Sequence, residues 1–362
     1  MSTRVTRKRA RLDSAADDDC DTQQSTAKGS DDPQDNAASA RTRDEEFWYD
    51  DGTIILVAGN VEFRVYKGIL AENSSVFRDM FSLPQPPVSS ETSDAPSPDN
   101  GCPIVHLSDT PEDLRHILRV YTPKTHPSPF EAPKDPSFAA IAAAARLGHK
   151  YQMTRLLEQA LAYLKTYYTN DYQAWQEKER WNPPGFQDEE AIGVVNLARF
   201  LGETSLLPTA LLACCQLGRD LIDGFAREDG TREQLTLDDI GLCLEAKPRL
   251  VQETTRTVLH VFEPGASVKC LSAGKCRNGF RRLLKMVEDR VVEVVGTNPF
   301  YGLFDRLGAG ADVELCQYCR AMAESRDSEK KQAVWARLPE ILGIPRPGPG
   351  GEGADGEAAG AA

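Results

Sequence analysis

The residues best suited to chemistry in this sequence are four cysteines near its C-terminal end. They form two pairs, Cys270-x5-Cys276 and Cys316-x2-Cys319. A tetrahedral zinc site needs four such ligands, and C-x2-C is a common way to present two of them. The first pair is spaced more widely than usual, but its surroundings, LSAGKCRNG, are typical of a loop that can bend both thiolates inward. The sequence therefore predicts a closed structural zinc site and no catalytic metal.

The alternative for these four residues is ordinary burial, because cysteine often acts as a small hydrophobic side chain. Three other cysteines lie beside leucines in helical patterns, and we predict that they belong to the core: Cys214, Cys215 and Cys243. The chain has nine cysteines and no secretory signal, since the basic N-terminus is not followed by an apolar segment. Free thiols or metal ligands are therefore expected rather than disulfides.

The sequence contains parts of known enzyme motifs, but each of them lacks required residues or context. Cys316-Gln317-Tyr318-Cys319 resembles a redox pair but lacks a βαβ context. Ser272–Lys275 resembles a phosphate loop, yet Lys269 stands where its first glycine should be. The five histidines form no metal-binding motif, and no G-x-S-x-G motif is present. We predict a protein that is not an enzyme, with a redox enzyme or metalloenzyme as the alternative.

Composition limits the partners. The 362 residues suggest about two domains, and the formal net charge is −13. An acidic chain is a poor candidate for nucleic-acid binding, which needs cations gathered on one face, and we expect no helix with a clustered basic face. No segment approaches the roughly 18 consecutive apolar residues of a membrane span. Neither a membrane nor a specific nucleic acid is expected as a partner.

Both ends of the chain are predicted to be disordered. Residues 1–46 contain almost no large apolar side chains, so they cannot bury enough surface to offset the entropy of ordering. This tail begins with a basic cluster that reads as a nuclear-import signal: Arg7, Lys8, Arg9 and Arg11. The alternative is a solvated basic tail, so we expect the nucleus, the cytoplasm or both. Residues 345–362 are rich in Pro, Gly and Ala.

Residues 47–168 read as a small α+β domain with a three-stranded sheet. Thr53–Val57 is a continuously apolar strand, and Gly59-Asn60 marks a hairpin turn into an alternating strand at 61–66. One face of that strand is expected in the core and the other, with Glu62, Arg64 and Tyr66, in water. Helices and one further strand are expected as follows: a helix from Ser74 to Phe81, a strand at 104–107, a helix capped by Thr110 with Pro111 in its first turn, and helices at 137–147 and 153–164. A Pro/Ser-rich loop at 82–103 interrupts the order.

Two segments of this domain carry a resemblance. DGTIILVAGNVEFRVYKGILAENSSVFRDMF followed by PIVHLSDTPEDLRHILRVYT resembles a BTB/POZ domain, and more narrowly the BTB proteins of basidiomycete fungi. The resemblance covers about a third of the chain and implies a docking module. Members dimerise, bind cullin-type ubiquitin-ligase scaffolds or recruit transcriptional regulators. Partners of these three kinds are therefore expected.

Two departures from the family pattern bear on these partners. Homodimerising members usually carry an extra strand and helix before the first hairpin, whereas this sequence has a polar segment there. Cullin binders often carry a hydrophobic-x-Glu motif after the first helical hairpin, where this chain reads Phe81-Ser82-Leu83-Pro84. An interaction scaffold or regulator is therefore the first hypothesis, and a substrate adaptor of a cullin-type ligase is the alternative. The expected contact surfaces are the first helical hairpin and the loop 82–103.

The rest of the chain, 171–344, is predicted to be an all-α domain. A polar linker leads into helices expected at 188–201, 204–217, from 237, and at 249–262, 278–295 and 319–338. SLLPTALLACCQL, LTLDDIGLCLEAKPRL and AVWARLPEILGI resemble the C-terminal half of the same fungal proteins. Amphipathic helices of this kind pack on one another beside the BTB-like unit.

Overall fold

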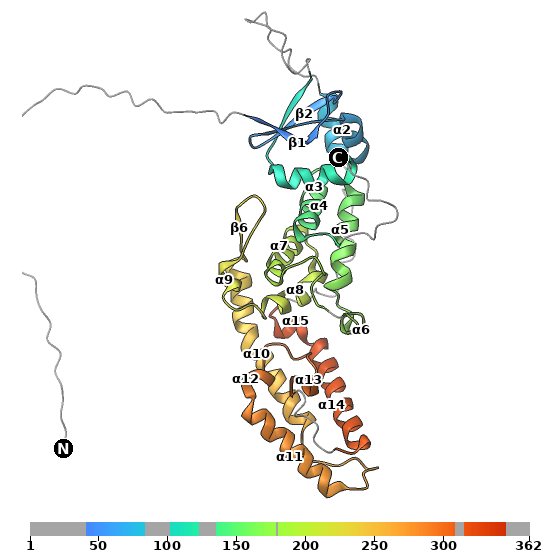
Figure 1. The fold of residues 1–362 in the computed structure, drawn as a ribbon, viewed down its shortest axis with the longest axis vertical. Helices are drawn as coiled ribbons and strands as arrows, with labels where there is room; N and C mark the ends of the chain where they lie inside the picture. The colour runs from blue at the N-terminus through green and yellow to red at the C-terminus, as the bar shows by residue number, and fades with distance from the viewer. Residues whose placement is uncertain (1–40, 84–101, 123–134, 179, 308–314, 345–362) are drawn as a thin grey trace, which may run out of the picture. The chain divides into compact units, whose positions relative to one another are not determined.

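The structure is a computed structural model, and it describes residues 41–83, 102–122, 135–178, 180–307 and 315–344 (Figure 1). An α+β unit comes first, and a mostly helical region follows it. The predicted fold class is thus confirmed. Both predicted disordered tails lie outside the described residues, apart from the last residues of the first one.

The α+β unit is built on a four-stranded sheet with the order β1-β3-β2-β4. Its strands are β1 Thr42–Trp48, β2 Ile54–Ala58, β3 Val61–Val65 and β4 Ile104–Leu107. β2 pairs antiparallel with β3, whereas β1 and β4 pair in parallel with their neighbours. The first and last strands of this order are the two edges of the sheet.

The central hairpin agrees with the sequence pattern. Every residue of β2 is buried, as a strand covered on both faces requires. Ala58 faces Val61 across the turn, and Gly59 adopts φ of +57°, a conformation that glycine reaches without strain. The Gly-Asn pair thus closes the hairpin where it was predicted.

The strand β1 was missed, so the prediction of a three-stranded sheet preceded by a polar tail is wrong at this point. Most residues of β1 are charged, so the sequence lacks the apolar pattern of a strand. Polar contacts hold this strand in place instead. Asp44 is 5% exposed; its carboxylate accepts the backbone N–H groups of Glu46 and Phe47 and pairs with Arg115 at 2.7 Å. A buried carboxylate is tolerated when it is satisfied in this way. Phe47 then adds a fully buried ring to the core.

Arg64 also differs from its prediction. The alternating pattern of β3 placed its side chain in water, but it is only 9% exposed. Its Nε donates to the carbonyl of Gly52 at 3.2 Å, and Tyr49 N–H donates to the carbonyl of Arg64 at 3.0 Å. The chain between β1 and β2 lies across this side chain, which is a consequence of the strand that the sequence pattern did not reveal.

Five helices complete the unit: α1 Lys67–Asn73, α2 Ser75–Ser82, α3 Pro111–Tyr121, α4 Phe138–Lys150 and α5 Thr154–Tyr167. The predicted start of α3 is confirmed, because the Thr110 hydroxyl accepts the N–H of Asp113 at 3.2 Å and Pro111 occupies the first turn. Ser74 caps α2 through the N–H of Phe77 and donates to the carbonyl of Tyr151 at 2.6 Å. This cap therefore joins the α1–α2 hairpin to the end of α4.

The C-terminal region contains 3-10 turns at Asp188–Glu190 and Thr204–Leu206 and the following elements: α6 Tyr172–Gln176, α7 Ala191–Leu201, α8 Leu207–Cys214, α9 Asp220–Asp223, β5 Phe225–Ala226, β6 Arg232–Glu233, α10 Leu237–Val261, α11 Ala273–Asp289, α12 Val291–Val294, α13 Leu303–Leu307, α14 Gln317–Ala336 and α15 Leu338–Ile341. The short β5–β6 hairpin is an exception to the all-α prediction. Asp229-Gly230, a hairpin-turn pair with Gly230 at φ of +79°, was the signal for it.

Helix α10 is continuous where two helices were predicted. Pro248 lies inside it, although proline removes a helical hydrogen bond and usually ends or kinks a helix. Residues on both sides of the proline are buried, among them Cys243 and Leu250, so the helix packs along its length. Tertiary packing thus overrides the local preference, and α10 runs beside α14 (Figure 1).

A single apolar core crosses the predicted boundary at 168–171. The ring of Phe138, on α4, meets Phe186 and Phe225 edge-to-face, with centroids 5.4 and 5.5 Å apart. The segment expected to be a polar linker is packed into this core through Trp175, which is 4% exposed and lies 5.0 Å from the ring of Trp335. The α+β unit and the first helices after it therefore share one interior.

A second core lies at the far end of α10. It contains aliphatic and aromatic side chains from α10, α11, α12, α13 and α14 and two cysteines, namely Val258, Val261, Phe262, Cys276, Phe280, Leu283, Val287, Val294, Leu303, Leu307, Cys319 and Ala323. Since α10 contributes to both cores, it is the physical link between them.

The β5–β6 hairpin is bound to the α+β unit by charged side chains. Arg227 pairs with Asp113 of α3 at 3.0 Å, and Glu228 contacts His116 of the same helix at 2.8 Å. Glu233 at the end of the hairpin pairs with Arg146 of α4 at 2.7 Å. The hairpin thus covers part of α3 and α4.

We expect Gly193→Ala to destabilise the shared core. A Cβ at Gly193, in α7, would come within 2.1 Å of the ring of Phe138, so the ring or the helix must shift. Overpacking of this kind costs about 1–3 kcal/mol. The change should therefore lower the midpoint of urea unfolding, measured by fluorescence.

Gly241→Ala is the matched control, because nothing lies within 4 Å of a Cβ at this position in α10. Alanine is favoured over glycine inside a helix by about 0.5–1 kcal/mol. We expect this variant to be neutral or slightly more stable. Equal effects of the two substitutions would show that the Phe138–Gly193 contact does not limit stability.

Candidate metal centre and interaction surfaces

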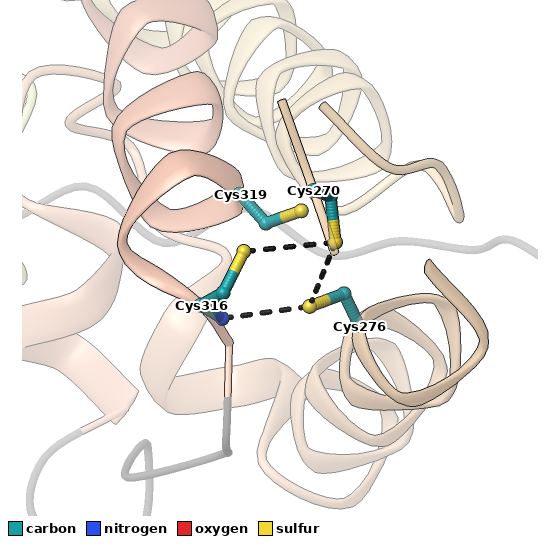
Figure 2. A group of neighbouring side chains, drawn as sticks. All are labelled: Cys270, Cys276, Cys316 and Cys319. Atoms are coloured by element: carbon teal, nitrogen blue, oxygen red, sulfur yellow. Dashed lines mark hydrogen bonds between the residues drawn. The ribbon is translucent and has the colours of Figure 1, made fainter. Parts of the chain in front are cut away.

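The four cysteines predicted to bind metal come together in the structure. Cys270 lies in the loop between α10 and α11, Cys276 in the first turn of α11, and Cys316 and Cys319 at the start of α14. Figure 2 shows their sulfur atoms turned toward a common centre. All four sulfurs lie within 4.8 Å of one another, an arrangement that can hold a metal ion.

Two distances between the sulfurs are close to those of a tetrahedral site. A Zn–S bond of about 2.3 Å implies sulfurs about 3.8 Å apart. The sulfur of Cys270 lies 3.6 Å from those of Cys276 and Cys316. A disulfide would need about 2.0 Å, so these residues are free thiols arranged as ligands.

Backbone N–H groups point at the sulfurs. Ser267 N–H donates to Cys319 at 3.3 Å, Ser272 N–H to Cys270 at 3.4 Å and Cys316 N–H to Cys276 at 3.4 Å. Such donors stabilise negative charge on sulfur and orient metal ligands from the outer shell. The local chain is therefore folded as it would be around thiolates.

Two thiols of the cluster have pKa values shifted in opposite directions. The backbone N–H of Cys319 donates to Cys316 and lowers the pKa of that thiol to about 7. Burial raises the pKa of Cys319 to about 12. Cys276 and Cys319 are almost fully buried in the second core, whereas Cys270 and Cys316 are partly exposed. The cluster thus opens to solvent on one side only.

The three cysteines predicted to be core residues are buried, as expected: Cys214, Cys215 and Cys243. Burial raises the pKa of the Cys214 thiol well above its usual value. These side chains pack in the first core and lie outside the sulfur cluster. Simple burial thus accounts for these three cysteines, while the other four are arranged as a ligand set.

The surface beside the cluster was not predicted. Helix α11 carries exposed cations along its solvent face, namely Lys275, Arg277, Arg281 and Arg282. The expectation that no helix has a clustered basic face is therefore wrong. The signal was present in the sequence, because the four cations fall at helix positions outside the buried stripe that contains Phe280 and Leu283.

The α1–α2 hairpin presents a polar outer surface. Glu72 on α1 and Arg78 and Asp79 on α2 are exposed, while Phe77 is buried and stacks on Tyr151 with ring centroids 4.4 Å apart. The hairpin is thus packed on the domain through Phe77, while these three charged side chains of its outer face are exposed in the described structure. Residues 84–101 of the second predicted contact surface lie outside the described residues, as do Arg7, Lys8, Arg9 and Arg11 of the predicted import signal.

Comparison with known proteins agrees with this architecture. The BTB/POZ domain family matches residues 43–168. This part of the chain is a BTB/POZ domain, a module for protein–protein interaction, followed by a mostly helical region. No curated protein matches the chain. Within the described ranges, no helix is long and apolar enough to cross a membrane.

We expect alkylation to rank the cysteines by environment. In chelator-treated protein at pH 7.5, iodoacetamide should modify Cys316 well before Cys214, because Cys316 is partly exposed and has a lowered pKa, whereas Cys214 is buried and has a raised pKa. Acidification below about pH 6 should slow the Cys316 reaction as the thiol becomes protonated. Peptide mass spectrometry over time would give the rates, and equal rates for the two cysteines would contradict the assignment.

Proposed function

We propose that this protein is a non-enzymatic interaction scaffold of the BTB/POZ type. One observation carries the proposal, namely that a BTB/POZ domain shares a continuous core with a helical extension. Such a fused body presents surfaces at fixed positions, which suits a scaffold. The metal-type cluster found in the described residues consists of four cysteines, the ligand set of closed structural sites rather than catalytic ones.

The proposal includes a structural zinc ion held by Cys270, Cys276, Cys316 and Cys319. Sulfur distances near those of a tetrahedral thiolate site and three N–H donors to sulfur support zinc. The ion would join α11 to α14 beside a small core and contribute folding energy. These residues present no open ligand position for a substrate.

We expect the purified full chain to contain one zinc ion, measured by inductively coupled plasma mass spectrometry. The double variant Cys316→Ser/Cys319→Ser should lose it. Loss of a structural metal can cost more than about 4 kcal/mol, so amide exchange should rise in α11 and at the start of α14 while α4 stays protected.

Cys102→Ser is the control, because Cys102 lies in the BTB/POZ domain outside the cluster. It should keep the zinc and the exchange pattern. Zinc retained by the double variant at full occupancy would contradict the four-cysteine site. A catalytic turnover lost by the double variant without loss of fold would favour the metalloenzyme alternative.

The partners proposed for the BTB/POZ domain are other BTB proteins or regulators, and a cullin is the alternative. At the end of α2 the chain reads Phe81-Ser82-Leu83-Pro84, without the hydrophobic-x-Glu motif of many cullin binders. A homodimer is supported by β1, because this strand precedes the first hairpin, where homodimerising family members carry an extra strand. Self-association is therefore part of the proposal.

We expect capture of partners from a fungal extract to depend on the α1–α2 hairpin. Glu72→Lys/Asp79→Lys reverses two exposed charges there and should reduce recovery of specific partners about tenfold, since interface charges oppose mismatched surfaces. Gln252→Lys, exposed on α10, is the control. Quantitative mass spectrometry gives the recoveries, and light scattering gives the mass of the free protein.

Each other outcome has a definite meaning. A cullin recovered in equal amount with the wild-type chain would make the protein a ligase adaptor. Recovery unaffected by the double charge reversal would remove the α1–α2 hairpin as the contact surface. We further propose a location in the nucleus, the cytoplasm or both, with import dependent on Arg7, Lys8, Arg9 and Arg11.

A further inference from the structure

The loop between α10 and α11 displays two aliphatic side chains completely to solvent. Val268 is 101% exposed and Leu271 96% exposed, the highest values among the large apolar residues that the structure describes. They lie on either side of Cys270, two positions before it and one after it. Side chains exposed to this degree add nothing to the folded core, so the structure itself gives no reason for their being apolar.

This loop is fixed in place at several points. Ser267 N–H donates to the sulfur of Cys319, and Ser272 N–H donates to the sulfur of Cys270. Cys270 itself belongs to the sulfur cluster. Val268 and Leu271 lie between these fixed points, so their outward display is a built feature of the loop.

Cations lie beside the aliphatic pair in the loop and follow it along α11. Between Pro264 and Val287 the sequence contains no Asp or Glu, and the nearest acidic side chain before it is Glu263. The following side chains are exposed and make no ion pair with any described residue: Lys269, Lys275, Arg277, Arg281 and Arg282. Lys285 differs, because it pairs with Glu288 at 3.0 Å. The chain as a whole has a net charge of −13, so this basic segment differs in sign from its surroundings and is suited to bind an anionic partner.

We propose that this tip, residues 264–282, docks on the surface of an anionic lipid bilayer. Basic side chains are attracted to anionic headgroups, and aliphatic side chains beside them enter the boundary between headgroups and acyl chains. Val268 and Leu271 need no preformed pocket there, because lipids rearrange around them. The phosphates of a nucleic acid would also attract the cations. Their surface, however, contains no apolar phase that Val268 and Leu271 could enter. Surface docking needs no membrane-spanning helix.

The proposal is tested with the full chain as purified and with its zinc content measured. Vesicles of phosphatidylcholine alone are compared with vesicles that also contain phosphatidylserine, using co-sedimentation. We expect binding to the anionic vesicles only, weakened by added salt. Val268→Ser/Leu271→Ser should reduce the partition coefficient about tenfold while the charge is unchanged.

Two further variants make the result specific. Lys269→Glu/Lys275→Glu should abolish binding to the anionic vesicles. Val292→Ser is the control, because Val292 in α12 is 88% exposed but lies outside the proposed tip. It should bind like the wild type. Zinc content equal to that of the wild type shows that the loop has kept its anchoring in each variant.

Three outcomes would overturn the proposal. The first is no binding of the wild-type chain to anionic vesicles. The second is binding that Val268→Ser/Leu271→Ser leaves unchanged, which would mean nonspecific charge attraction. The third is preferential binding to a mixed-sequence DNA duplex or single-stranded RNA, with equal affinity in the wild type and this variant. None of these outcomes bears on partner capture by the BTB/POZ domain, so the two proposals fail independently.

Discussion

The contact between Phe138 and Gly193 is the constraint on which the arrangement of this protein depends. Phe138 begins α4 of the BTB/POZ domain, and its ring lies where any side chain on Gly193 of α7 would have to go. Edge-to-face contacts with Phe186 and Phe225 surround the same ring. Because interiors are packed as densely as organic crystals, such a contact fixes position and not merely proximity. The domain and its extension are therefore one body in the described chain.

The second core has a different basis for its stability. It gathers few large side chains, which come from α11, from short helices and from the ends of α10 and α14 that meet there. A small core supplies little net stability after the entropy of ordering is subtracted, and natural proteins commonly add a metal or disulfides to such units. The four sulfurs lie at the edge of this core, where α11 meets α14. A metal held by the cluster would thus cross-link the two helices that this small core has to keep together.

The sequence predicted those features whose signal is local. Thr110 and Pro111 mark a helix start by their own chemistry, and the Gly59-Asn60 turn needs no distant partner. The four-cysteine cluster was predicted from ligand spacing, because C-x2-C is a common way to present two metal-binding thiolates. The identity of the ion that the cluster would hold follows from the ligand chemistry of thiolates and not from the fold.

Features that depend on distant contacts were missed. Strand β1 reads as a charged tail because Asp44 is stabilised by Arg115, far away in sequence. Helix α10 continues through Pro248 because packing on both sides of the proline outweighs its local preference. The basic face of α11 was overlooked in a chain that is acidic overall, although the helical repeat contained it. Net charge is an average and does not describe a surface.

The β5–β6 hairpin has a consequence for access to the BTB/POZ domain. Through Arg227, Glu228 and Glu233 it occupies part of α3 and α4 from within the same chain. A tethered segment acts at an effective concentration of about a millimolar or more, set by its linker. Any partner that binds this side must compete with a ligand that never diffuses away. Among the described residues, the outer face of the α1–α2 hairpin has no such competitor, so competition from within this part of the chain is confined to the α3–α4 side.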